Sequence, residues 1–177
     1  MGFSLLVVRS VVGALMIGHG TQKLYGWLGG GGPEGTAKFF SMLGYPKPKQ
    51  KAMIAGAAEA LSGALFILGL ATPLAAAMLI GVMLNAMYSA HAGKGPWITN
   101  GGWEYTLVLS TISFMLAWMG PGAYSMDRVI GWYPDGAFAG LSALALGILT
   151  GIVILSTRRA VLDEREQQEE ASHRRAA

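Results

Sequence analysis

The sequence predicts an all-α membrane protein, a four-helix transmembrane bundle with a fifth transmembrane helix at its C-terminal end. Of the 177 residues, 53% are hydrophobic and only 13% are charged. The mean hydropathy of +0.44 lies outside the range that is usual for soluble domains. Five apolar runs each approach the roughly 20 residues that a helix needs to cross a bilayer. They occupy residues 3–20, 52–71, 73–91, 103–120 and 137–156.

Three regions follow from these runs. Residues 1–135 should form the four-helix bundle with a long first loop, residues 136–157 the additional helix, and residues 158–177 a charged tail. The first run is expected to be a span and not a signal peptide, because it carries Arg9 and lacks a basic segment before its apolar core. The fifth run is also expected to be a span, because an unbroken apolar segment of this length would be unfavourable in water.

The first loop should contain a flexible turn followed by a short helix. Residues 29–33 read Gly-Gly-Gly-Gly-Pro, a composition typical of turns. A helix over residues 36–43 should follow. It could lie at the membrane interface or enter the membrane as a re-entrant segment.

The later elements carry start and contact signals. Thr72 and Pro73 are typical of a helix start and join the second and third runs in a hairpin. Ser125 should cap a brief helix that ends near residue 132. Gly147 and Gly151 would allow close helix contact, and a homo-oligomer could form through them.

The basic residues predict the orientation of the chain. With five spans, the first loop, the loop before the fourth span and the tail share one side of the membrane, and the opposite loops hold only Arg128. Because positive loops remain inside, the N-terminus should be outside and the tail in the cytoplasm of a bacterial-type inner membrane. The residues on the positive side are Lys23, Lys38, Lys47, Lys49, Lys51, Lys94, Arg158, Arg159, Arg165, Arg174 and Arg175.

Charged residues inside the spans are the candidate site. A charge at mid-membrane costs roughly 2.5–3.5 kcal/mol on insertion scales, so Glu59 should have a partner or a function. We expect it to contact Arg9 or Lys23. Helix depth and small-residue faces predict one cavity in the cytoplasmic half that holds Lys23, Glu59, Asn85 and Glu104. The full candidate set for a ligand or a proton path is Arg9, His19, Lys23, Glu59, Asn85 and Glu104.

Each of these residues also has a structural interpretation. Glu59 with Arg9 could be an ion pair that fixes helix registry, and Glu104 could stabilise a helix N-terminus. Lys23 could be an anchor at the interface. His19 and His91 are two histidines without a carboxylate-rich motif, so no metal site is expected. The chain has no cysteine, which removes disulfide, thiolate and iron–sulfur chemistry.

Several motifs, taken in order, resemble DoxX-type membrane proteins. They are Arg9-x3-Gly13, His19-Gly20-x2-Lys23-Leu24, Glu59-x3-Gly63-x5-Gly69, Thr72-Pro73, Gly101-Gly102-Trp103-Glu104 and Gly120-Pro121-Gly122-x2-Ser125-x-Asp127. The resemblance covers roughly residues 4–130 and implies a four-helix membrane bundle, to which residues 136–177 would be an extension. It also implies an association with quinone-linked or oxidative-stress redox systems.

The sequence leaves three functions open and does not decide whether the chain is an enzyme. The first is a small membrane component of a redox system that binds a small amphipathic molecule such as a quinone, without a covalent cofactor. The second is a small-solute transporter or channel. The third is a non-catalytic subunit that recruits a soluble or membrane redox enzyme. We expect the chain to be embedded in a lipid bilayer. No nucleic-acid partner is expected, because the basic residues lie in the loops on one side of the spans.

Overall fold

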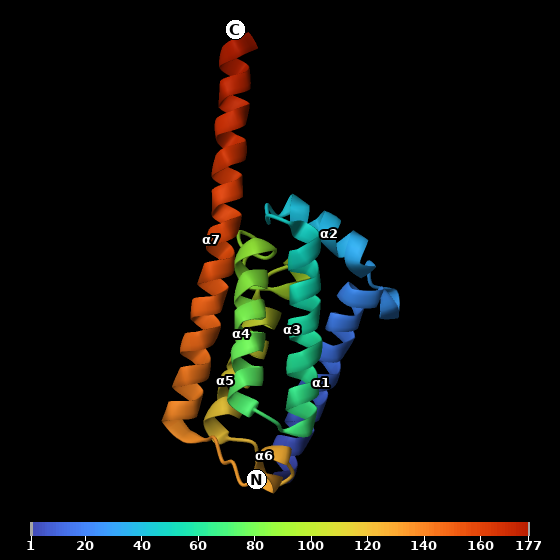
Figure 1. Cartoon of the computed structure of the whole chain (residues 1–177), viewed down its shortest axis with the longest axis vertical. Coiled ribbons are helices and arrows are strands. Elements are labelled where there is room, and N and C mark those ends of the chain that lie inside the picture. The colour runs from blue at the N-terminus through green and yellow to red at the C-terminus, as the bar shows by residue number, and fades with distance from the viewer. Residues whose placement is uncertain (1, 177) are drawn as a thin grey trace.

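The computed structural model describes residues 2–176, with side chains described through Arg158 and at Val161, Leu162 and Gln167. Within residues 2–176 every regular element is helical, which confirms the predicted fold class (Figure 1). The elements are α1 (Gly2–Tyr25), η1 (Trp27–Gly29), α2 (Gly32–Met42), α3 (Pro48–Leu68), α4 (Thr72–Ser89), η2 (Ile98–Asn100), α5 (Glu104–Met119), α6 (Met126–Val129) and α7 (Gly136–Ala176).

Four of these helices are long and apolar enough to span a membrane, and the chain is a multi-pass membrane protein. They are α1, α3, α4 and the first part of α7, Gly136–Arg158. The fourth predicted span, α5, is apolar but has only 16 residues. At 1.5 Å per residue it is about 24 Å long, less than the roughly 30 Å of a hydrocarbon core. It still lies inside the bundle against α4 and α7.

Two packed groups of helices make up the bundle. In the first, α1 lies along α3, and small residues let the two backbones approach. A Cβ at Gly13 would lie 2.5 Å from the Gly63 carbonyl oxygen, and one at Gly20 would lie 2.6 Å from that of Gly56. In the second group α4 packs against both α5 and α7.

The small residues of α7 also serve packing within the chain. A Cβ at Gly147 would lie 2.7 Å from Ile80, and one at Gly151 would lie 2.5 Å from Leu84, so both glycines face α4. A homo-oligomer through these glycines stays a prediction, and it would require α7 to give up these contacts with α4.

The basic loops gather at one end of the bundle, as the sequence predicts for five passes (Figure 1). We call this the basic end: it holds α2, the connection between α4 and α5, and the point where α7 leaves the bundle. The N-terminus, the α3–α4 turn and α6 lie at the opposite end. Beyond Arg158, α7 continues to Ala176 as one helix, and most side chains of the predicted tail lie outside the described residues.

The connections differ from expectation at the start of α2 and at the end of α6. The helix α6 ends at Val129 and not near residue 132, because Gly131 adopts a left-handed conformation that stops it. The helix predicted over residues 36–43 begins earlier, at Gly32, because Pro33 occupies its first turn, where proline is favoured. It contacts α1 and α3 and lies across their ends, a placement typical of an interfacial helix (Figure 1). The Ser125 cap is confirmed, since its hydroxyl accepts a hydrogen bond from the Arg128 backbone N–H at the start of α6.

The close approach of α1 and α3 leads to a paired test. Gly13→Ala should destabilise the protein by about 1–3 kcal/mol, because the new methyl group would collide with the α3 backbone. Gly18→Ala, on the same helix, has only Leu28 within 4 Å, at 3.6 Å, and should be neutral or slightly stabilising. Reversible unfolding in mixed detergent micelles measures both variants. Equal effects would contradict the proposed contact.

Candidate functional site

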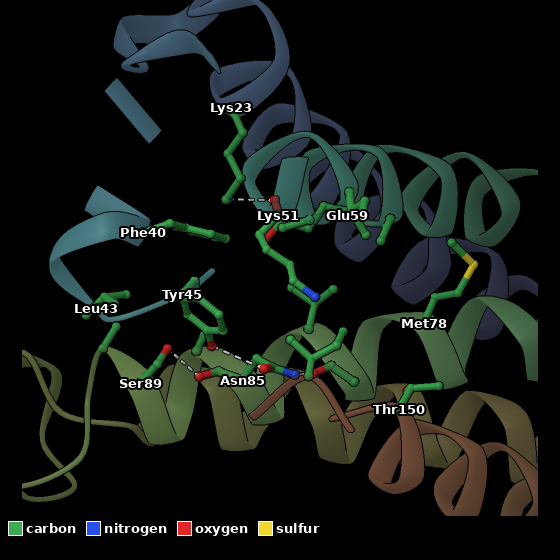
Figure 2. Close-up of a pocket in the computed structure, with 18 of the residues that line it drawn as sticks. Lys23, Phe40, Leu43, Tyr45, Lys51, Glu59, Met78, Asn85, Ser89 and Thr150 are labelled. Carbon is green, nitrogen blue, oxygen red and sulfur yellow. Dashed lines mark hydrogen bonds and ion pairs between the residues drawn. The ribbon is translucent and has the colours of Figure 1, made fainter. Parts of the chain in front are cut away.

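A cavity of about 510 Å³ lies between α3 and α4 near the basic end. Its walls come from α3, α4 and α7, and α2 with residues 43–45 closes it on one side (Figure 2). The volume falls within the roughly 300–1,000 Å³ range of small-molecule sites. Most of its lining is apolar, with a few polar side chains at the basic end.

Small side chains leave this space open. Ala55 and Ala58 face the cavity from α3, and Ala77 and Gly81 face it from α4. Larger residues also line it, Ile54 from α3 and Leu74, Met78 and Val82 from α4. The two helices nevertheless pack mainly against other partners, α3 against α1 and α4 against α5 and α7. The cavity therefore lies at the seam between the two helix groups.

An ion pair forms part of the wall. The Lys23 ammonium donates to Glu59 Oε2 at 2.6 Å, and the two residues come from α1 and α3. The Glu59 side chain is almost fully buried, whereas Lys23 keeps about a quarter of its side chain exposed. Lys23 also donates to the His19 carbonyl oxygen at 3.4 Å. The expectation that Glu59 contacts Arg9 or Lys23 is thus met by Lys23.

Arg9 has a different environment, so its predicted place beside Glu59 is wrong. It is fully buried near the opposite end, where its Nη2 donates to the Tyr124 carbonyl oxygen at 2.5 Å and its guanidinium contacts Gly69. The reason is depth: the first span begins at that end, and residue 9 lies only two turns into it. Arg9 therefore secures the connection between α5 and α7 to the α3–α4 turn.

At the same opposite end, Asp127 connects α6 to the start of α4. Its Oδ1 accepts from the Ala71 backbone N–H at 2.8 Å, and its Oδ2 accepts from the Thr72 N–H and hydroxyl at 3.2 and 3.1 Å. The carboxylate thus caps the start of α4, where the helix dipole favours negative charge. From the sequence, Asp127 is named only as part of a motif, and its role at the start of α4 emerges from the structure.

At the basic end, Asn85 and Tyr45 connect the covering segment to the bundle. The buried Tyr45 donates its hydroxyl to Asn85 Oδ1 at 3.1 Å (Figure 2). Asn85 donates in turn to the carbonyl oxygens of Gly81 at 2.8 Å and Gly151 at 3.4 Å. Burial raises the pKa of Tyr45, so the phenol remains a neutral donor. Sequence reasoning missed Tyr45, because it precedes Pro46 in what reads only as a loop.

Of the remaining polar residues that the sequence singled out, His91 lies in the cavity lining, and Glu104 and His19 lie outside it. His91 lines the cavity and its Nδ1 lies 2.6 Å from the Gly101 carbonyl oxygen. Glu104 is not in the lining, so the expectation that it shares the cavity is wrong: its Oε1 accepts from the Ile98 N–H at 2.6 Å and holds the turn before α5. His19 lies outside the lining as well, near Glu59 and beside Tyr105, with ring centroids 6.2 Å apart.

Among the described residues, no group of three or more His, Asp or Glu side chains could hold a metal ion. The polar side chains that line the cavity carry three amines, one carboxylate, one imidazole, one amide and three hydroxyls. Such groups can bind and orient a polar head group and exchange protons with it.

These features define a multi-pass helical membrane protein whose bundle holds a largely apolar cavity with a polar end. Residues 4–92 match the family DoxX, and the chain belongs to this family. A protein of Bacillus subtilis (strain 168) named "Putative oxidoreductase CatD" is 29% identical over 111 residues, which cover 63% of this chain and 76% of that protein. No solved structure matches the chain. The matched residues 4–92 contain Lys23, Glu59, Asn85 and His91, whereas α5, α6 and α7 lie beyond them.

The ion pair can be tested by a double-mutant cycle. Glu59→Gln and Lys23→Met should each destabilise the protein, because each leaves a charge without its partner; the loss is roughly 3–5 kcal/mol for a fully buried pair and less here, where Lys23 is partly exposed. The double variant should recover about 0.5–3 kcal/mol as coupling energy. Unfolding free energies in detergent measure the cycle, and strictly additive losses would contradict the pairing.

Proposed function

We propose that this chain is a small membrane component of a redox system that binds a small amphipathic molecule, such as a quinone, in the cavity between α3 and α4. One observation carries the proposal: an apolar cavity of about 510 Å³ has a buried Lys23–Glu59 pair in its wall. An apolar space with a few convergent polar groups suits a molecule with a polar head and a hydrophobic tail. The name of the Bacillus subtilis relative supports the redox association.

The residues of this chain would bind the ligand and handle its protons. Lys23 and Glu59 place a donor and an acceptor at the wall, and Asn85 and Tyr45 add hydrogen-bonding groups at the basic end. A quinone that is reduced takes up two protons with two electrons, so a protonatable pair beside its ring would be useful. The chain has no cysteine, so it has no thiol pair or cysteine-ligated iron–sulfur cluster to supply these electrons, and we assign their supply to a partner.

A second candidate role is recruitment of that partner. The helix α7 has 41 residues, of which Gly136–Arg158 is the apolar part. The helix continues for 18 residues after Arg158, about 27 Å, and beyond Leu162, which packs on Gly44, it projects from the bundle (Figure 1). A projecting helix of this kind is a surface on which a soluble enzyme could dock, as expected for a non-catalytic subunit.

The ligand assay uses the purified protein in a neutral detergent and a short-chain quinone. Glu59→Gln should weaken binding by about 10- to 100-fold, the loss expected for one charge-assisted hydrogen bond. Two matched controls should bind as the wild type does: Glu104→Gln, which changes a carboxylate outside the cavity, and Lys47→Gln on the exposed loop. Folding of each variant is checked by gel filtration and circular dichroism. No quinone binding by the wild type, or binding unaffected by Glu59→Gln, would contradict the proposal.

The proposed orientation places the basic end in the cytoplasm of a bacterial-type cell membrane and the N-terminus outside. Reporter fusions after Ala177 and within residues 29–32 should both give a cytoplasmic signal, and a fusion at Gly131 an external one. A cytoplasmic signal at only one of the first two positions would contradict the five-pass arrangement.

A further inference from the structure

The charges that face the cavity do not balance. Its lining contains Lys23, Lys51 and Lys94 but only one acidic residue, Glu59. Glu59 is already paired with Lys23. The cavity therefore has a surplus of two positive charges within a mostly apolar lining, and such a surplus is stabilised by an anionic ligand.

The two lysines in excess are Lys51 and Lys94, and Lys51 is the more informative of the two. It comes from the first turn of α3, is half-buried, and extends across the cavity toward α4 (Figure 2). Among the residues whose side chains are described, it has no hydrogen-bond or ion-pair partner. A half-buried ammonium group that points into an apolar space is unfavourable unless a negative group accompanies it.

The neighbouring lysines do not share this placement. Lys47 is exposed and outside the cavity, and Lys49 is an exposed residue that pairs with Glu34 at 2.5 Å. Either of these positions satisfies a preference for positive charge on one side of the membrane. That preference does not explain why the Lys51 side chain points into the cavity, whereas a bound anionic ligand would explain it.

The length of the cavity indicates that the anionic ligand also carries a hydrophobic chain. Its α4 wall extends from Leu74 to Ser89, about 22 Å along the helix. This distance exceeds half of a hydrocarbon core of roughly 30 Å. A chain that starts beside Lys51 could thus run along the cavity toward the middle of the membrane.

Access from the lipid is also indicated. The rim residues Ile54 of α3, Leu74 of α4 and Leu146 of α7 are all substantially exposed, at 57%, 50% and 44%. They would face acyl chains in a membrane, while α2 and residues 43–45 cover the cavity at the basic end. The open side of the cavity therefore faces the bilayer between α3 and α7.

We propose that the ligand is a membrane-borne amphiphile with one hydrocarbon chain and an acidic head group, which enters between α3 and α7 and places its head on Lys51. The inference rests on the proposed function, since it concerns the same cavity, and it deepens it by specifying the charge of the ligand. Both a carboxylate and a phosphate have the required chemistry. A neutral quinone of comparable chain length should bind more weakly.

The experiment compares chain-matched probes with the full-length protein in a neutral detergent. Oleate and oleyl phosphate supply the two acidic heads, oleyl alcohol the neutral head, and a benzoquinone that carries an oleyl chain the neutral quinone. Direct binding of each probe is measured by equilibrium dialysis. We expect one or both acidic probes to bind at least about tenfold more tightly than oleyl alcohol, and their ranking identifies the head group.

Variants of Lys51 then assign the contact. Lys51→Gln should reduce the affinity for the acidic probe by about 10- to 100-fold and leave oleyl alcohol unaffected. Lys51→Arg should keep most of the affinity, and Lys47→Gln all of it. Equal binding of acid and alcohol, or an acid affinity that Lys51→Gln does not change, would overturn the inference. If the quinone with the oleyl chain binds more tightly than the acids, the inference is wrong while the proposed function stands. If no probe binds, both are wrong.

Discussion

Most polar groups that leave water find partners within the chain, and this constraint organises the bundle. At the opposite end, Asp127 accepts three hydrogen bonds from the start of α4 and Arg9 donates to the Tyr124 carbonyl oxygen. At the basic end, Lys23 pairs with Glu59. Each set joins elements far apart in the sequence, because a charge that is removed from water has few compensating groups near it. The two ends are thus held by polar contacts, and the middle is left to packing.

Packing in the middle separates the helices into two groups with a seam between them. Glycines bring α1 against α3, and Gly147 and Gly151 bring α7 against α4. Since association between helices in lipid depends on close contact and not on the exclusion of water, these small-residue faces decide which helices pair. Where α3 and α4 meet, the small residues are unmatched by large ones, and the cavity results.

The sequence predicts the parts of this structure that depend on local or periodic signals. Apolar length predicts the spans, the Ser125 hydroxyl predicts the start of α6, and the cost of a buried charge predicts that Glu59 has a partner. The choice between Arg9 and Lys23 depends on depth along α1, which a pattern of charges does not resolve. Glu104 does not share the cavity; it begins α5 and accepts from the Ile98 backbone N–H, which agrees with the alternative interpretation of Glu104 at a helix N-terminus.

The roles of Lys51 and Tyr45 could not be predicted for a different reason. Lysines at 47, 49 and 51 are equivalent as positive charges beside a span, and only the phase of α3 turns one of them into the cavity. Tyr45 acquires its role from Asn85, 40 residues later, across a turn whose geometry the sequence leaves undefined.

The helix α7, which lies beyond the residues that match the family, is connected to the same cavity. Thr150 and Ile154 form part of its wall. Arg158 donates to the Leu43 carbonyl oxygen at 2.5 Å, and Leu162 packs on Gly44. The segment that covers the cavity at the basic end is thus held by the additional helix as well as by Asn85. Under the proposed function, a cover held in this way would direct access toward the lipid, and α7 would help to determine what enters the cavity.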